Sequence, residues 1–176
     1  MKNLLRAIAV SLIVVTFSVL CGCNYNIHNS PEAVVRAFFE ASAKSDPTTI
    51  LECCPDYEIR RLAQEAGLPQ DINRKSLANF FKMEGAHGYS NFELEGFAIT
   101  LCELIDHMPA EDFPINREYY GMTGMEYREI TEVAIVKVEY EYKDVDYDNE
   151  IRKGKWEVKC IKIGNKWYLL SSYLGY

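Results

Sequence analysis

The spacing of the apolar residues changes near the middle of this 176-residue chain, and this change limits the fold more than any other feature. Between residues 30 and 85, apolar side chains recur every three or four positions, which is typical of amphipathic helices. From residue 89 onward they recur every second position, which is typical of strands with one buried face. Helices followed by strands predict an α+β fold, in which amino-terminal helices cover one face of a curved antiparallel sheet.

Capping residues predict where the helices begin. The segment 30–32 reads Ser-Pro-Glu, which supplies an N-cap, a proline at the first helical position and an acid in the first turn. The Asp-Pro pair at 46–47 repeats this arrangement ahead of a short helix that Pro55 ends. Two further helices are expected over 57–66 and 73–85.

The second half of the chain predicts long, bent strands. Residues 131–145 alternate between apolar and charged side chains, which indicates one dry and one wet face. Two further strands, 155–163 and 166–174, are joined by a Gly-Asn turn. In the first strand the apolar phase shifts after Gly96, which predicts a β-bulge there. The segment 109–127 shows no period and is expected to be an irregular or short helical connection.

The amino terminus has the three-part layout of a secretory signal. Lys2 and Arg6 precede an uncharged apolar stretch, 7–20, and small residues follow. A permanent membrane-spanning helix needs about 20 apolar residues, and this stretch is shorter. We therefore expect export rather than a permanent span.

The sequence Leu-Cys-Gly-Cys at 20–23 resembles the lipobox of bacterial lipoproteins, in which a small residue precedes the cysteine that becomes the mature amino terminus. Cys23 fits this position because Gly22 precedes it, and Cys21 does not because a leucine precedes it. The resemblance implies a diacylglyceryl thioether on Cys23, whose two acyl chains would hold the protein stably at a membrane. An uncleaved anchor or an ordinary cleaved signal is the alternative.

These features divide the chain into a signal peptide, 1–22, a lipidated cysteine with a short tether, 23–29, and a single domain, 30–176. Loss of Lys2 and Arg6 leaves 17 basic against 26 acidic residues, a formal charge of −9. An acidic domain argues against nucleic-acid partners and against a polybasic grip on anionic lipid. The predicted location is extracytoplasmic, on the bacterial cell membrane, and held by the Cys23 lipid alone.

Three segments carry a resemblance to a known fold family. SPEAVVRAFF at 30–39, SDP at 45–47 and GNKWYLLS at 164–171 resemble the nuclear transport factor 2-like superfamily, especially its small secreted bacterial lipoproteins. The resemblance implies a cone-shaped domain with a helix-lined cavity above a strongly curved sheet. The same fold hosts isomerases, dehydratases, transport factors and non-catalytic envelope domains, so the function has to be argued from a site.

Enzymes of that superfamily use an Asp or His base deep in the cone, and the candidates here are Asp106, His107 and His87. Asp106 and His107 are neighbours, so on a strand they point to opposite faces. The Met-Pro pair that follows indicates an exposed strand end, so we expect surface residues rather than a catalytic pair. No residue is therefore assigned a catalytic role.

Aromatic residues on the predicted strands are the candidates for binding. Tyr140, Tyr142 and Trp156 are expected either to line a ligand pocket or to pack in the core. The expected ligand is small and apolar, or the partner is an envelope protein.

Four cysteines remain after Cys23. A disulfide between Cys102 and Cys160 is one expectation, because export permits it and both lie on predicted strands. Buried reduced thiols are the alternative, and the adjacent Cys53 and Cys54 cannot pair without distortion.

Neither a metal nor a cofactor is expected. The sequence has no C-x-x-C pair and only three histidines. The acidic turn 144–150 departs from the EF-hand pattern at its sixth and twelfth positions. We expect it to be a solvated hairpin tip, with Arg152, Lys153 and Lys155 compensating its charge.

Together these features favour a lipid-anchored, non-catalytic binding or interaction module of the cell envelope. An isomerase or dehydratase that acts on a small apolar substrate in the cone is the alternative. A third class is a structural module that packs on an envelope protein through the exposed face of its sheet.

Overall fold

In the computed structural model, residues 26–84, 94–115, 122, 124–145 and 148–170 are described here. The elements follow in the order α2 (Pro31–Ala43), α3 (Pro47–Glu52), α4 (Asp56–Glu65), α5 (Arg74–Glu84), β1 (Ala98–Pro109), η1 (Ala110–Asp112), α6 (Gly124–Glu129), β2 (Ile130–Asp144), β3 (Glu150–Ile163) and β4 (Lys166–Leu169). The strands form one antiparallel sheet in the order β1-β2-β3-β4. The predicted α+β class, with helices first and strands later, is confirmed.

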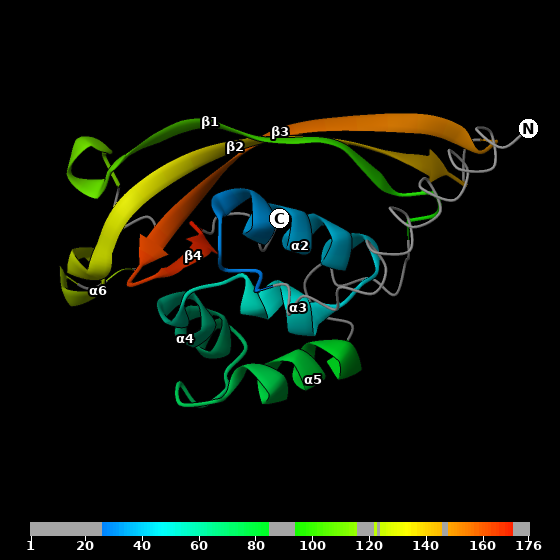
Figure 1. Ribbon diagram of the computed structural model, residues 1–176. Coiled ribbons are helices and arrows are strands. Elements are labelled where there is room, and N and C mark those ends of the chain that lie inside the picture. Colours follow the sequence, from blue (N-terminus) through cyan, green and yellow to red (C-terminus); the bar gives the residue numbers. More distant parts are fainter. Residues whose placement is uncertain (1–25, 85–93, 116–121, 123, 146–147, 171–176) are drawn as a thin grey trace, which may run out of the picture.

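The sheet arches over α2, while α3, α4 and α5 lie on the far side of α2 (Figure 1). The predicted caps hold the first helices in place. The Ser30 hydroxyl accepts a hydrogen bond from the Ala33 amide at 3.1 Å, and the Asp46 carboxylate accepts one from the Thr48 amide at 3.1 Å. Each cap satisfies an amide that the first helical turn leaves without a partner.

The long strands β2 and β3 pair from Ile130 opposite Ile163 to Asp144 opposite Glu150. The predicted turn after Ile163 is confirmed, and Gly164 adopts a positive φ of 60° there, a conformation that glycine takes at no steric cost. Strand β3 begins five residues before the predicted start at 155, because its first residues are largely exposed and so lack an apolar alternation.

The bulge predicted at Gly96 is wrong. Gly96 lies in a turn before β1 begins at Ala98. The irregularities of β1 lie instead between Ile99 and Leu101 and between Leu104 and Asp106, where its register against β2 shifts. The strand is therefore bent as predicted, at different residues. Most of the strand expected from residue 89 lies outside the described residues.

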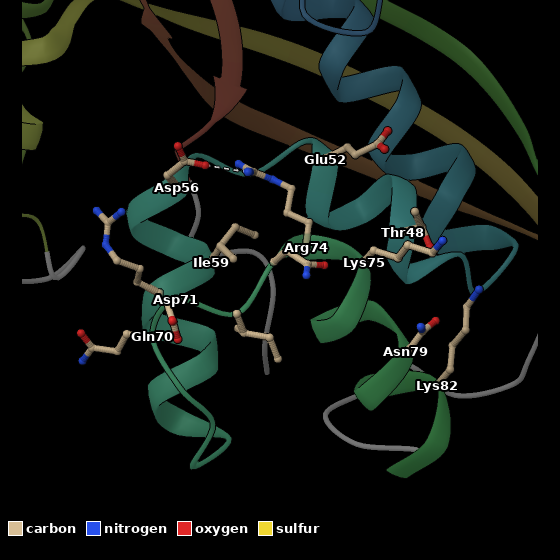
Figure 2. Close-up of a pocket in the computed structure, with 13 residues that line it drawn as sticks. Thr48, Glu52, Asp56, Ile59, Gln70, Asp71, Arg74, Lys75, Asn79 and Lys82 are labelled. Atoms are coloured by element: carbon tan, nitrogen blue, oxygen red, sulfur yellow. Dashed lines mark ion pairs between the residues drawn. The ribbon is translucent and has the colours of Figure 1, made fainter.

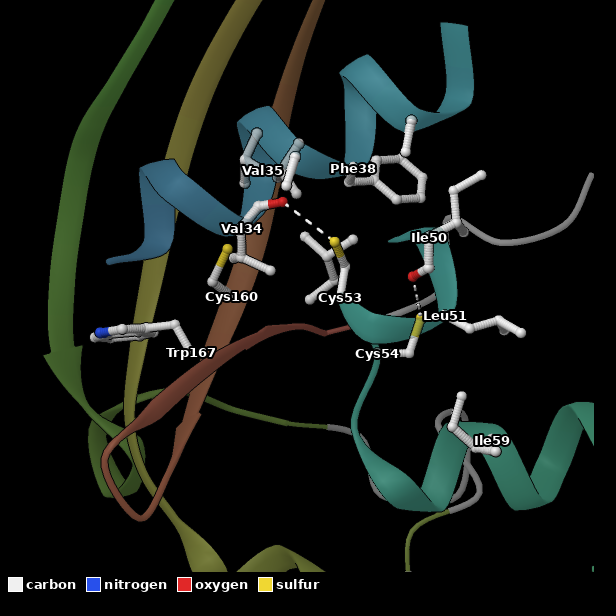
Figure 3. Close-up of a cluster of buried hydrophobic side chains, with 14 of the residues drawn as sticks. Val34, Val35, Phe38, Ile50, Leu51, Cys53, Cys54, Ile59, Cys160 and Trp167 are labelled. Carbon is white, nitrogen blue, oxygen red and sulfur yellow. Dashed lines mark hydrogen bonds between the residues drawn. The ribbon is translucent and has the colours of Figure 1, made fainter. Parts of the chain in front are cut away.

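The main core lies between α2 and the concave face of the sheet and continues among α3, α4 and α5. Val34 and Val35 of α2 are fully buried, and so are Val136 and Val138 of β2. Figure 3 shows Val34, Val35 and Phe38 grouped with Cys53 of the segment after α3 and Cys160 of β3. Burial of such side chains contributes on the order of 1.5–3 kcal/mol each before entropic costs.

A second apolar cluster covers the start of β2. Val133 and Ile161 are fully buried there. Val133 points to the face opposite to that of its neighbour Ala134, which is buried in the main core. Both faces of the sheet are therefore covered at this point. Ala110, Ile115 and Met122 pack in this cluster. The described residues of the segment 109–127 thus cover the other side of the sheet, and their expected short helical character is confirmed by η1 and the start of α6.

Candidate functional site

The three residues predicted to line a pocket lie together near the end of the sheet where β2 turns into β3. Trp156 of β3 donates a hydrogen bond from its indole nitrogen to the Tyr140 hydroxyl at 3.2 Å. The rings of Tyr140 and Tyr142, both on β2, stack with centroids 6.4 Å apart. The alternation of β2 places these tyrosines on the same face as the buried Val136 and Val138.

Two further rings complete the group. Phe39, from the carboxyl-terminal half of α2, lies 5.4 Å from Tyr140 between centroids. Phe97, just before β1, lies 5.5 Å from Tyr140. The aromatic cluster therefore consists of residues from four separate segments: Phe39, Phe97, Tyr140, Tyr142 and Trp156.

A glycine makes room for the central ring of the aromatic cluster. Gly154 of β3 pairs directly with Tyr140, and a Cβ atom on Gly154 would lie 2.2 Å from Cζ of Tyr140. The Tyr140 ring therefore lies across the backbone of β3. This close approach explains a glycine inside a strand, where it otherwise destabilises the fold.

Exposure separates the aromatic cluster from the core. Trp156 is 48 % exposed, whereas Val138, its direct partner across the ladder, is fully buried. The aromatic cluster offers ring faces, an indole and phenol hydroxyls. Such groups suit contact with a flat or apolar ligand that also accepts or donates hydrogen bonds.

Asp106 and His107 lie on the exposed surface of β1, as the sequence indicates. His107 Nε2 lies 2.6 Å from Glu132 Oε2, and Glu132 also accepts a hydrogen bond from Lys162 at 2.6 Å. The hydrogen bond from Lys162, together with that of His107, lowers the pKa of Glu132. These side chains form a solvated polar row across three strands. His87, the other candidate base, lies outside the described residues.

All four cysteines of the domain are free thiols. Cys53 donates to the Val34 carbonyl at 3.6 Å, and burial raises the pKa of its thiol to about 12. The expected bond between Cys102 and Cys160 is not formed, because β2 lies between their strands. Next-but-one strands are about 10 Å apart, beyond the roughly 7 Å between Cα atoms that a disulfide spans.

The negative charge of the acidic hairpin between β2 and β3 is compensated by a basic residue of β3. Arg152 lies 3.2 Å from the Asp144 carboxylate and 3.5 Å from that of Glu150. Residues 146–147 of this turn lie outside the described residues. In the parts of the chain that are described, no three His, Cys, Asp or Glu side chains gather where a metal ion could bind.

A groove of about 1010 Å³ lies between α3, α4 and α5, away from the sheet (Figure 2). Its lining includes four basic and three acidic residues: Arg60, Arg74, Lys75, Lys82, Glu52, Asp56 and Asp71. Arg74 pairs with Asp56 at 2.6 Å and donates to the carbonyls of Leu51 and Cys54 at 3.2 and 2.9 Å. Sequence reasoning missed this groove, because its polar residues follow no motif spacing.

Comparison with known protein families, curated proteins and solved structures finds no match to this chain. Within the described ranges, no helix is both long enough and apolar enough to span a lipid bilayer. Cys23 and the predicted signal peptide precede the described residues.

Proposed function

We propose that this protein is a lipid-anchored, extracytoplasmic binding module of the bacterial cell envelope, which contacts its ligand or partner through the aromatic cluster. The observation that carries the proposal is the 48 % exposure of Trp156 within a group of five aromatic side chains. Large aromatic side chains that stay partly exposed at the edge of a core are typical of recognition surfaces.

The anchor is proposed from the lipobox-like sequence that ends at Cys23. Two acyl chains suffice to hold a domain at a membrane without help from basic residues, which suits a chain this acidic. The nuclear transport factor 2-like identity of the domain is part of the same proposal. It is supported by the arched antiparallel sheet with α2 beneath it (Figure 1).

Packing under the sheet favours binding over catalysis in a cone. An isomerase or dehydratase of this fold would hold its base and its substrate between the helices and the concave face. Here that space contains the buried side chains of Val34, Val35 and Phe38, packed on Val136 and Val138. The aromatic cluster, in contrast, borders solvent.

The charged residues on the opposite face of the sheet argue against a structural module that packs on another protein through this face. Lys137 lies 2.9 Å from Glu139 and 3.7 Å from Glu103, so opposite charges alternate on it. Exposed pairs of this kind stabilise a fold by at most about 1 kcal/mol each. Around Lys137 this face therefore presents charged pairs, which suit contact with water better than a packed apolar interface.

The anchor is tested by the intact mass of membrane-extracted protein, wild type against Cys23→Ala. We expect a mature chain that begins at Cys23 and carries a diacylglyceryl group, and we expect the variant to lack the lipid. An unprocessed chain, or a chain cleaved without lipid, would contradict the proposed anchor.

The binding surface is tested with anilinonaphthalene sulfonate, a flat apolar probe whose fluorescence rises when it leaves water. We expect Trp156→Ala to weaken probe binding, and the matched variant Ile151→Ala, on the same strand, to leave it unchanged. Equal binding by both variants and by the wild type would show that the aromatic cluster is not the contact surface.

A further inference from the structure

The chain enters the folded domain through a clamp on β4. His28 donates a hydrogen bond from Nδ1 to the Trp167 carbonyl at 2.8 Å, and the Trp167 amide donates to the His28 carbonyl at 3.1 Å. The His28 ring also packs against Tyr168, with centroids 4.6 Å apart. The tether is therefore fixed from His28 onward.

This clamp lies beside the groove between α3, α4 and α5. The amide of Leu169, two residues after Trp167 on β4, donates to the Cys53 carbonyl at 2.9 Å. Arg74 of the groove lining donates to the carbonyls of Leu51 and Cys54, on either side of Cys53. Cys23 precedes His28 by five residues, which span at most about 17 Å, so a lipid on Cys23 would keep this side of the domain near the bilayer.

The groove carries basic side chains on one face of α5. Lys75, Asn79 and Lys82 are spaced so that they share that face, and Figure 2 shows them along one side of the groove. Among the described residues, the ion pairs of the groove are Arg74 with Asp56 and Arg60 with Glu126, and neither involves these lysines. Glu52 and Asp71 are the remaining acidic residues of the lining.

Net charge determines which side of the domain can approach a membrane. The mature chain is acidic overall, so an anionic bilayer repels most of its surface. In the groove, basic residues outnumber acidic ones by four to three. Arg74 and Arg60 are already paired, so Lys75 and Lys82 of α5 are the basic groups of the groove that can meet anionic headgroups.

We propose that the groove faces the membrane and takes the phosphate of an anionic phospholipid headgroup between Lys75 and Lys82, which orients the anchored domain. This inference rests on the proposed lipidation of Cys23. The lipid supplies the affinity and the groove supplies the orientation. The sheet and its aromatic cluster, on the other side of α2 (Figure 1), are then directed away from the bilayer.

The test uses full-length protein, with its lipid verified by intact mass, in vesicles of phosphatidylglycerol or of phosphatidylcholine. A membrane-impermeant amine-acylating reagent is added, and modified lysines are measured by mass spectrometry. We expect labelling of Lys75 and Lys82 to fall on the order of fivefold in phosphatidylglycerol, as for a lysine at an anionic surface, and to recover at high salt. Lys153 and Lys155 of β3 should be labelled equally in both vesicles.

Charge-reversal variants provide the matched control. In phosphatidylglycerol, amide hydrogen exchange of α5 should be slower than in phosphatidylcholine for the wild type and for a Lys153→Glu, Lys155→Glu double variant. The Lys75→Glu, Lys82→Glu double variant should lose this difference. Equal labelling of the groove lysines in both vesicles, with the lipid present, would overturn the groove inference alone. A chain without lipid would contradict the anchor and this inference together.

Discussion

The two halves of the long β2–β3 ladder differ sharply, although they belong to the same pair of strands. In the half that α2 covers, the concave face carries small and branched side chains such as Ala134 and Val136, both fully buried. In the half toward the hairpin, the same face carries Tyr140, Tyr142 and Trp156, which are partly or largely exposed. The same face of the ladder is thus part of the core at one end and part of the surface at the other.

Helix and strand lengths account for the difference. The 13 residues of α2 span about 20 Å, whereas the 15 residues of β2 span about 50 Å. One helix therefore cannot cover the whole strand. Beyond the end of α2, the rings of the aromatic cluster cover the concave face of the sheet. Their outer faces remain exposed and can contact a ligand.

The largest expected effect comes from truncating a side chain in the covered half. Leu169→Ala removes a fully buried side chain of β4 and should lower the free energy of unfolding by about 2–5 kcal/mol. Ile151→Ala, at a β3 position that is 63 % exposed, should cost less than about 1 kcal/mol. Urea denaturation measures both, and similar losses would contradict the difference in burial between Leu169 and Ile151.

Gly154→Ala should have an intermediate effect. The new Cβ would overlap the Tyr140 ring, so the ring must move and the hydrogen bond from Trp156 is lost. We expect a cost of about 1–3 kcal/mol, as for other overpacking substitutions. In a Tyr140→Ala background the cost should shrink, and a double-mutant cycle with no coupling would show that the ring does not lie over this glycine.

Tyr140→Phe should have a smaller effect. The substitution removes only the hydroxyl that accepts from the Trp156 indole, and this bond is partly exposed, so the expected cost is about 0.5 kcal/mol. Tryptophan emission should change, because the indole nitrogen of Trp156 no longer donates to the Tyr140 hydroxyl. An unchanged emission spectrum would mean that the bond is absent in solution.

The smallest effect concerns the clamp at His28. Burial lowers the pKa of His28 below its usual 6.5, so between the two values the unfolded chain binds more protons than the folded one. The free energy of unfolding should therefore fall as the pH drops below 6.5, the usual pKa of histidine. His28→Gln should flatten this part of the pH profile, measured by urea denaturation. An equal slope in the variant would assign the pH dependence to other groups.

The helices could be predicted from the sequence because their signals are local. Ser30 and Asp46 each cap a helix through an amide two or three residues away, and Gly164 needs only its own turn. The bulge at Gly96 could not be placed correctly, because a bulge depends on which residues oppose it on β2. That pairing is a long-range property of the sheet.

The candidate site could be predicted only in part, for the same reason. Tyr140, Tyr142 and Trp156 stand out as aromatic residues on alternating strands. Phe39 and Phe97 come from segments far away in the chain, and no local pattern links them to Tyr140. The groove between α3, α4 and α5 arises from helix packing alone.

The two tryptophans of the chain allow the most direct test, because each lies in one half of the sheet. Trp156 is 48 % exposed and Trp167 is 6 % exposed. We would measure acrylamide quenching of the single-tryptophan variants Trp167→Phe and Trp156→Phe. We expect Trp156 to be strongly quenched and Trp167 to be protected. A protected Trp156 would contradict an uncovered aromatic surface, and with it the proposed binding site.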